Sequence, residues 1–232
     1  MIRKHFQYRE TITSILADGA VEIEAAKVGI LDARHEIEAV IAADPFFGST
    51  FEPCDPVSDH PVIRRMVDAA YEANVGPMAA VAGTIAWAGA ESMKVAGAAF
   101  GVVDNGGDIA FFSDRPLRIG IYAGVGSQNA FLLPPQEEIY GVCTSSATIG
   151  PSISLGSADA VTVFSDNVSV ADAWATSLCN RLVPEDRSAL DDLVGSRVHG
   201  VLAHFGEMMI SHGTVPEIVP AFVNPALITK GI

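Results

Sequence analysis

Two oxygen-bearing side chains, Asp172 and Thr176, lie four residues apart near the middle of an apolar segment. On a helix, positions with this spacing share one face. A carboxylate and a hydroxyl, supplemented by backbone carbonyls, form an all-oxygen ligand set suited to Mg²⁺ or Ca²⁺. The alternative is structural: Asp172 caps a helix, and Thr176 is solvated or bonds back to the helix backbone. Spacing alone favours this second interpretation.

The small residues between Val75 and Gly83 could offer a surface for an anion. Pro77 suits the first turn of a helix, where its missing N–H would have no partner in any case. Free N–H groups and the partial positive charge at such a helix start attract phosphate. Spacing alone favours the alternative, a small-residue helix packed tightly in the core. The residues expected to contact a ligand here are Gly76, Pro77, Met78 and Ala79.

Residues 104–108 combine a turn signal with a carboxylate. Asn105 and Gly106 lie between two apolar runs, a pattern that predicts a β-hairpin. The paired glycines, Gly106 and Gly107, would let a ligand approach the backbone. Asp108 could bind hydroxyl groups or a cation. The two interpretations are compatible, and we expect both.

A loop over residues 144–157 is predicted to begin with Thr144, Ser145 and Ser146. Hydroxyl and backbone N–H groups in one loop could hold an anion together, although a polar surface loop has the same composition. Cys143 precedes this loop, but nothing in the sequence places a base beside it. A buried structural thiol is therefore the favoured interpretation. The histidines show no zinc-type spacing.

The elements that must position these residues follow from apolar periodicity and turn signals. We expect an α+β fold in a single domain, residues 1–232, because no linker, repeat or low-complexity run divides the chain. The predicted helices cover residues 25–43, 62–73, a third starting at Gly76, 170–182 and a short 191–200. The predicted strands cover residues 6–11, 14–16, 21–24, 98–103, 109–112, a pair formed by 117–122 and 139–143, and 160–164. Residues 200–232 are predicted as strands and extended segments.

Composition narrows the class of protein. A net charge of −14 argues against nucleic-acid binding, which needs clustered Lys and Arg. No run of about 18 apolar residues predicts a membrane span, and no secretory signal is recognisable. The three cysteines, Cys54, Cys143 and Cys179, are far apart and are expected to be reduced thiols. We therefore expect a cytoplasmic protein without a membrane partner, and a homodimer by default.

Four blocks in this order, residues 74–83, 104–109, 143–146 and 171–176, resemble the signatures of an uncharacterised ApbE-like family. That family is related to the FAD:protein FMN transferases, Mg²⁺-dependent enzymes that split FAD and attach FMN to a threonine of an acceptor protein. The resemblance runs over nearly the whole chain and implies an ApbE-like fold, with mixed or antiparallel sheets packed with helices.

The resemblance also implies roles for individual residues. Gly106, Gly107 and Asp108 match a flavin-binding Gly-Gly-Asp strand end. Asp172 and Thr176 match the Ala-Asp-Ala-x-x-Thr pair that holds the metal, with the carbonyl near Ala79 as a third ligand. The Thr-Ser-Gly loop of the transferases is matched by Thr144, Ser145 and Ser146.

The chain departs from the transferases in three places. Ala80 stands where they have a lysine, and Pro151-Ser152-Ile153-Ser154 occupies the region of their His-Ile-x-x-Pro segment. Most of their N-terminal flavin-contacting portion is missing. These departures suggest that the pocket kept its architecture while its ligand or reaction changed.

Three hypotheses about function follow. The first is Mg²⁺-dependent FMN transfer from FAD, in which the metal neutralises charge on the transferring phosphoryl group. The second is a non-catalytic protein that binds FAD or FMN as the partner of a redox enzyme. The third is a redox or cofactor-biosynthesis enzyme that uses the same pocket for another ligand. Binding of a flavin-type nucleotide is favoured over any particular reaction.

Overall fold

The computed structural model describes residues 1–56, 58–121, 128–146, 158–221 and 229. In these residues, eight strands form one sheet in the order β1-β2-β3-β4-β7-β8-β9-β10, with every neighbouring pair antiparallel. Their bounds are β1 (Ile2–Tyr8), β2 (Thr11–Ala17), β3 (Phe100–Asn105), β4 (Asp108–Ser113), β7 (Gln136–Ser145), β8 (Ala160–Ser165), β9 (Val198–Phe205) and β10 (Met208–Gly213).

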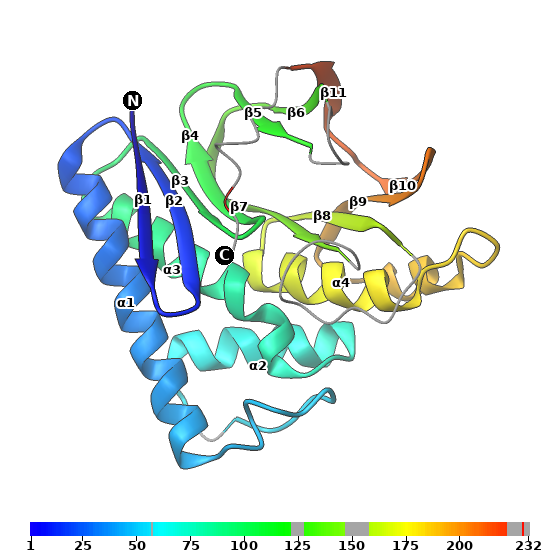
Figure 1. The fold of residues 1–232 in the computed structure, drawn as a ribbon, viewed down its shortest axis with the longest axis horizontal. Helices are drawn as coiled ribbons and strands as arrows, with labels where there is room; N and C mark the ends of the chain where they lie inside the picture. The colour runs from blue at the N-terminus through cyan, green and yellow to red at the C-terminus, as the bar shows by residue number, and fades with distance from the viewer. Residues whose placement is uncertain (57, 122–127, 147–157, 222–228, 230–232) are drawn as a thin grey trace.

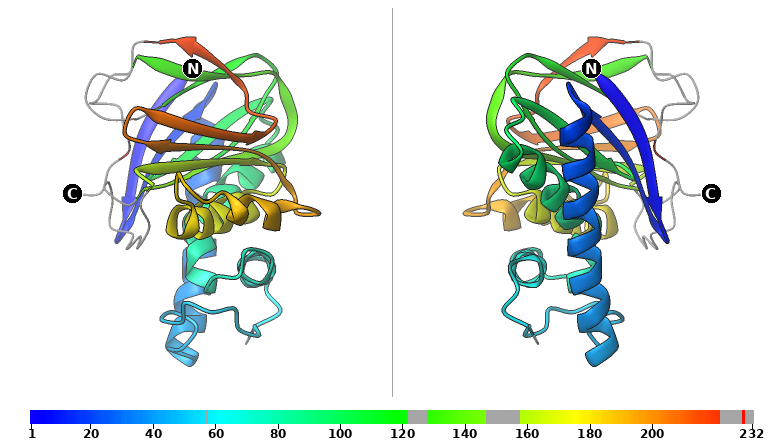
Figure 2. Two further views of the ribbon diagram at one scale, coloured as in Figure 1. Left: turned by 90° about the vertical axis from the view of Figure 1, so that its right-hand side faces the viewer. Right: turned by 90° about the vertical axis from the view of Figure 1, so that its left-hand side faces the viewer.

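The helices pack on one face of this sheet and a small second sheet lies on the other (Figures 1 and 2). The small sheet has the order β11-β6-β5. Its strands are β5 (Leu117–Gly120), β6 (Asn129–Leu133) and β11 (Glu217–Pro220). The helical elements are α1 (Ala20–Ala43), α2 (Pro61–Ala73), the 3-10 turn η1 (Pro77–Ala80), α3 (Val81–Val95), α4 (Val168–Arg181) and the 3-10 turn η2 (Ser188–Leu193). This mixture of helices with antiparallel sheets confirms the α+β class.

Strand alternation divides the interior into two cores. In β3, Val103 packs with the helices, whereas Val102 belongs to the core shared with the small sheet. In β7, Cys143 and Val142 are divided in the same way. The helix-side core fixes α3 and α4 against the sheet. The predicted residues Asp172 and Thr176 lie on α4, and the predicted residues 76–79 lie directly before α3.

The strand predicted at residues 21–24 is wrong, because α1 already starts at Ala20. Four residues cannot separate a period of two from a period of 3.6. Ile23 is buried while Val21 is 71% exposed, and the buried set continues at helical spacing through Ala26 and Ile30. The whole segment is therefore one long amphipathic helix.

Other boundaries also need correction. Residues 117–122 and 139–143 do not pair: β5 pairs with β6, which was not predicted, and β7 lies between β4 and β8. The short helix predicted at 191–200 is replaced by η2, and Val198 already belongs to β9. The third helix begins with the 3-10 turn η1 before α3. Helices 62–73 and 170–182 and the hairpin of β3 and β4 are confirmed.

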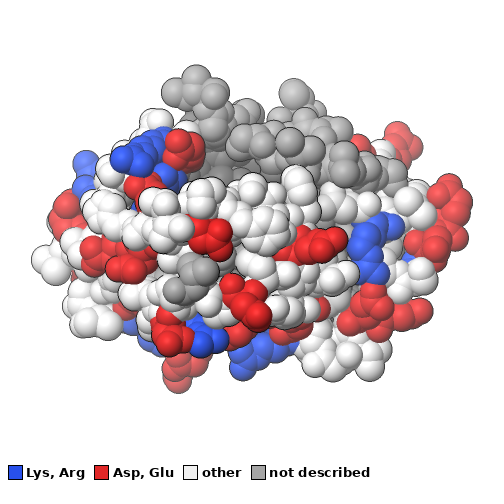
Figure 3. Space-filling model, turned by 90° about the horizontal axis from the view of Figure 1, so that it is seen from below, with Lys and Arg blue, Asp and Glu red and all other residues white. Residues whose placement is uncertain are grey.

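Among the described residues, no helix combines the length and the apolar character that crossing a membrane requires. Seen from below Figure 1, where the helices lie, the surface carries acidic side chains widely, and basic side chains lie among them (Figure 3). Among the described residues, ion pairs join Arg65 to Glu91 and Arg181 to Asp192. The acidic balance of the sequence is thus visible on this face.

Candidate functional site

Asp172 lies inside α4, and it does not cap that helix. The N-cap is Asn167, whose side chain accepts a hydrogen bond from the N–H of Val170 at 3.0 Å. Asp172 is 6% exposed, and its Oδ2 accepts a hydrogen bond from the backbone N–H of Gly83 at 2.7 Å. The capping interpretation of Asp172 is therefore wrong for its own helix. Its carboxylate instead receives a donor from the first turn of α3.

Gly83 explains why a small residue is needed at this contact. A Cβ placed on Gly83 would lie 2.9 Å from both the Cβ of Asp172 and the carbonyl oxygen of Val168. Real Cβ atoms do not approach so closely, and both neighbours belong to a packed helix. The close approach of α3 to α4 therefore depends on glycine at position 83, which brings the α3 backbone within hydrogen-bond distance of Asp172.

The hairpin of β3 and β4 brings a second carboxylate to the same place. Gly106 and Gly107 have φ values of +72° and +110°, in the region that favours glycine. The N–H of Gly107 donates to Oδ1 of Asp104 at 2.9 Å. Asn105 and Asp108 are directly paired across the hairpin, and the Asn105 amide donates to the carbonyl oxygen of Ala82 at 3.0 Å. The hairpin end is thus tied to the start of α3.

Asp108 is half-buried, and its Oδ1 is a buried acceptor with no hydrogen-bond partner. Burial raises the pKa of Asp108 well above its usual range, and the negative charges of Asp172 and Asp104 add to the rise. Burial likewise raises the pKa of Asp172 to about 7, although hydrogen bonds from the backbone N–H groups of Gly83 and Ala82 act in the opposite direction. Two interacting carboxyl groups therefore share a desolvated site.

Cys143 lies beside this pair, directly opposite Asp108 across β4 and β7. Its thiol is fully buried and contacts the carbonyl oxygen of Val168 at 3.6 Å. Burial raises the pKa of Cys143 well above its usual range, and the charges of Asp108 and Asp172 raise it further. A thiol held neutral is a weak nucleophile, which agrees with the structural interpretation of this residue.

The three hydroxyl residues after Cys143 do not share one face. Thr144 and Ser145 continue β7, contrary to the predicted loop start at 144. Because side chains alternate along a strand, Thr144 points to the sheet face opposite Cys143, where its hydroxyl bonds that of Thr162 at 2.9 Å. Ser146 is buried and donates to the carbonyl oxygen of Asp159 at 2.7 Å. The rest of the predicted loop, residues 147–157, lies outside the described residues, and so does the 151–154 segment.

The small-residue block before α3 is mostly enclosed. Gly76 and Pro77 are buried, and a Cβ on Gly76 would lie 2.0 Å from the carbonyl oxygen of Thr50. Met78 and Ala79 are half-buried, and the N–H of Ala79 donates to the carbonyl oxygen of Gly76 at 3.0 Å. Packing therefore accounts for Gly76, and ligand contacts at these four positions remain predictions.

Thr176 lies one turn after Asp172 on α4 and is half-buried. Within the described ranges, no group of three or more His, Cys, Asp or Glu side chains is arranged to hold a metal ion. A metal at this place would need oxygen atoms of other kinds, which the Thr176 hydroxyl and nearby backbone carbonyls offer. The residues present therefore fit a hard cation such as Mg²⁺ better than a soft one.

Sequence reasoning missed two structural partners of the site. Gly83 was grouped with the other small residues, and its hydrogen bond to Asp172 joins residues 89 positions apart. Thr84 was not singled out; it is fully buried, bonds the hydroxyl of Ser169 at 2.7 Å and donates to the carbonyl oxygen of Ala80 at 2.6 Å. A buried threonine inside an alanine-rich helix is the one local signal that could have indicated a polar helix contact.

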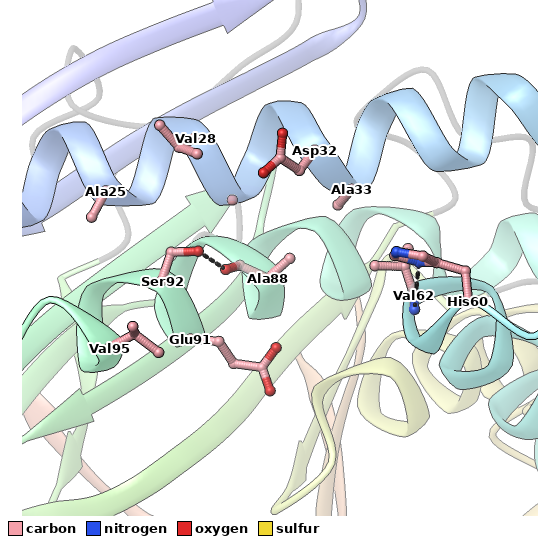
Figure 4. Close-up of a pocket in the computed structure, with 11 residues that line it drawn as sticks. Ala25, Val28, Asp32, Ala33, His60, Val62, Ala88, Glu91, Ser92 and Val95 are labelled. Carbon is pink, nitrogen blue, oxygen red and sulfur yellow. Dashed lines mark hydrogen bonds between the residues drawn. The ribbon is translucent and has the colours of Figure 1, made fainter.

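A hollow of about 420 Å³ lies elsewhere, between α1, α3 and the start of α2 (Figure 4). It is bordered by apolar residues such as Val28 and Val95 and by the carboxylates of Asp32 and Glu91. None of the residues predicted to bind a ligand lines it. The hollow is thus separate from the carboxylate pair.

Comparison with known proteins identifies the family. A sequence model of the family described as AbpE bacteria matches residues 2–195. A UPF0280 protein of Methanosphaerula palustris is 56% identical, and the match covers 100% of this chain and 99% of the relative. A UPF0280 protein of Methanoculleus marisnigri is 58% identical, with 100% of this chain and 96% of the relative covered.

Solved structures share the fold. Flavin Transferase ApbE from Vibrio cholerae has a TM-score of 0.62 at 12% identity, with 91% of this chain and 96% of that chain covered. The ApbE protein from Thermotoga maritima has a TM-score of 0.56 at 12% identity, with 99% of each chain covered. At such identities the likeness shows a common fold. The chain belongs to the family described as AbpE bacteria, and the UPF0280 proteins are its relatives.

Proposed function

We propose that this family member binds a flavin nucleotide, FAD or FMN, beside Asp172 and Asp108. We further propose that it uses Mg²⁺ there to split FAD and transfer the FMN part to an acceptor protein. The observation that carries the proposal is the desolvated carboxylate pair, in which Asp108 Oδ1 has no partner and Asp172 receives a backbone N–H. Family membership and the fold shared with flavin transferases support the choice of a flavin ligand.

The residues that would hold the metal are Asp172, Thr176 and the carbonyl of Ala79. When bound, Mg²⁺ would neutralise negative charge on the phosphate groups of the nucleotide. Gly83 fixes the Asp172 carboxylate by donating its N–H at 2.7 Å. Asn105 holds the hairpin end against the start of α3 through the carbonyl of Ala82. Both contacts are made to the start of α3. They would hold the strand end at Gly106, Gly107 and Asp108 in a fixed position relative to α4.

One observation favours the alternative of binding without cleavage. Ala80, at the position of the transferases' lysine, is fully buried, and its carbonyl accepts the hydroxyl of Thr84. This position therefore supplies no cation to a phosphate. A protein that holds FAD or FMN as the partner of a redox enzyme would not need that charge, whereas phosphoryl transfer normally uses such stabilisation.

The test is to incubate the full chain with FAD and Mg²⁺ and to separate AMP and FMN by chromatography. The variant is Asp172→Ala, and the matched control is Asp191→Ala, which removes an exposed carboxylate in η2. Mg²⁺-dependent AMP release that is lost only in Asp172→Ala would support cleavage. FAD that binds and stays intact would favour the carrier function. If FAD neither binds nor reacts, the flavin proposal is refuted.

A further inference from the structure

We propose that Asp108 is a direct ligand of the divalent cation, so that the site holds its metal with two carboxylates, one from the hairpin and one from α4. This inference rests on the proposed function, because it concerns the same cation. It assigns to Asp108 a role different from the flavin contact that the sequence resemblance implies.

One oxygen of the Asp108 carboxylate is an unsatisfied hydrogen-bond acceptor. Oδ1 of Asp108 is buried and has no hydrogen-bond partner. Leaving a buried carboxylate oxygen unpaired is costly, and native structures rarely keep such an atom without a reason. The other carboxylate of this hairpin, Asp104, shows the usual arrangement, because its oxygens accept from the Gly107 N–H and from the Thr229 hydroxyl. The Asp108 carboxylate does accept hydrogen bonds from the backbone N–H of Thr144 and from the Cys143 thiol, but these leave Oδ1 without a partner, whereas both oxygens of Asp104 are paired.

A series of contacts connects Asp108 to Asp172. Asp108 pairs with Asn105 across the hairpin, and Asn105 is bonded to the carbonyl of Ala82 in α3. The next residue, Gly83, is bonded to the carboxylate of Asp172. These three contacts connect Asp108 to Asp172 through Asn105 of β3 and the consecutive residues Ala82 and Gly83 of α3. The electrostatic interaction between Asp108 and Asp172 agrees with their closeness.

The negative charges of Asp108 and Asp172 also favour a cation. Of the ion pairs formed by the described residues, none includes Asp108 or Asp172. Two buried carboxylates without a cation repel each other, and a cation between them would remove that repulsion. One or two carboxylates completed by other oxygen atoms are the usual protein ligands of Mg²⁺. The hydroxyl of Thr176 and a backbone carbonyl would supply those oxygens.

The experiment measures Mn²⁺ binding to the full chain without flavin, by the electron paramagnetic resonance signal of free Mn²⁺. Asp108→Asn keeps the shape of the side chain and removes its charge. We expect the variant to bind Mn²⁺ at least about tenfold more weakly, since the loss of even an outer-shell partner costs roughly 10- to 100-fold. The matched control is Asp104→Asn, which removes a neighbouring negative charge whose side chain is already hydrogen-bonded. We expect its Mn²⁺ affinity to fall less than that of Asp108→Asn, because Asp104 already accepts hydrogen bonds from Gly107 and Thr229 and is not a ligand in this proposal.

The outcomes separate this inference from the proposed function. If Asp172→Asn loses Mn²⁺ binding and Asp108→Asn binds like the wild type, the inference is wrong and the metal site stands. Equal weakening by Asp104→Asn and Asp108→Asn would also overturn it, because the effect would then come from net charge alone. If Asp172→Asn binds Mn²⁺ normally, the proposed metal site itself fails.

A second measurement does not depend on the folding of any variant. Anomalous diffraction from Mn²⁺-soaked crystals of the wild type would place the ion. Direct ligation predicts an Asp108 oxygen within about 2.0–2.6 Å of the ion, the range of hard cations with oxygen ligands. A peak beside Asp172 with both Asp108 oxygens beyond about 3.5 Å would overturn the inference, because that distance leaves room only for a bridging water.

Discussion

Replacing Asp172 with Asn should make the metal-free protein more stable at alkaline pH. The pKa of Asp172 is raised by burial from its ordinary value of 3.8 to about 7. Between these two values the folded state binds more protons than the unfolded state, so the free energy of unfolding falls as pH rises from about 4 to about 7. An amide carries no charge at any of these pH values. The free energy of unfolding of the variant should therefore not fall through the ionisation of residue 172.

The size of the effect follows from the same two pKa values. Their difference of about 3 corresponds to about 4 kcal/mol, at 1.36 kcal/mol for each unit. Relaxation around the ionised carboxylate reduces this figure. Asn retains an oxygen that can accept the Gly83 N–H, so the hydrogen bond of 2.7 Å between α3 and α4 need not be lost. We expect Asp172→Asn to raise the free energy of unfolding at pH 8 by about 2 to 4 kcal/mol.

The assay is urea unfolding followed by circular dichroism, at pH 5 and pH 8, with a chelator present. The wild type should be less stable at pH 8 than at pH 5, and the stability of the variant should depend less on pH because the contribution of Asp172 is removed. Asp191→Asn, an exposed control, should change stability by less than about 0.5 kcal/mol. A variant no more stable than the wild type at pH 8 would refute the reasoning, because the ionised Asp172 would then be well solvated. Saturating Mg²⁺ should stabilise the wild type at pH 8 and leave the variant unchanged.

Three further predictions concern the same region. Gly83→Ala should lower the stability by about 1–3 kcal/mol through overpacking, and by more than Gly89→Ala, because its Cβ would meet the backbone oxygen of Val168 whereas that of Gly89 would meet only side-chain atoms; urea unfolding compares the two. Mn²⁺ affinity should rise between pH 6 and pH 8, because the raised pKa values of Asp172 and Asp108 make protons compete with the metal, and calorimetry in buffers of different ionisation enthalpy should detect proton release. Ellman's reagent should modify the half-buried Cys54 in the native protein and the buried Cys143 and Cys179 only after unfolding.

The sequence predicted the elements whose periodicity is long and regular. Residues 25–43 and 62–73 are helical because buried apolar residues recur at helical spacing, and the Asn105-Gly106 signal correctly marks a hairpin. Short patterns failed. Residues 21–24 alternate by chance inside a helix, and residues 191–200 join the end of η2 to the first strand residues of β9. In each failure, packing at a distance decides the structure and the local pattern does not.

The same limit applies to the candidate site. The sequence identified Asp108 and Asp172 separately, each with a local structural alternative. Their relation depends on Gly83, which is close to Asp172 only because α3 and α4 pack side by side. The local periodicity of a sequence cannot predict a contact between residues so far apart in the chain. The alternation of Thr144 to the opposite sheet face likewise required knowing that β7 continues past Cys143.

The contact between Gly83 and Asp172 also changes the argument about phosphate. The start of α3 was expected to attract an anion through free N–H groups, but the Gly83 N–H is donated to a carboxylate of the protein itself. A phosphate that approached this helix end would therefore meet a negative side chain on a protein of net charge −14. Such an approach is favourable only if a cation lies between the two groups. For this reason nucleotide binding and divalent-cation binding should be coupled: the nucleotide should bind more tightly with Mg²⁺, and Mg²⁺ more tightly with the nucleotide, by the same factor.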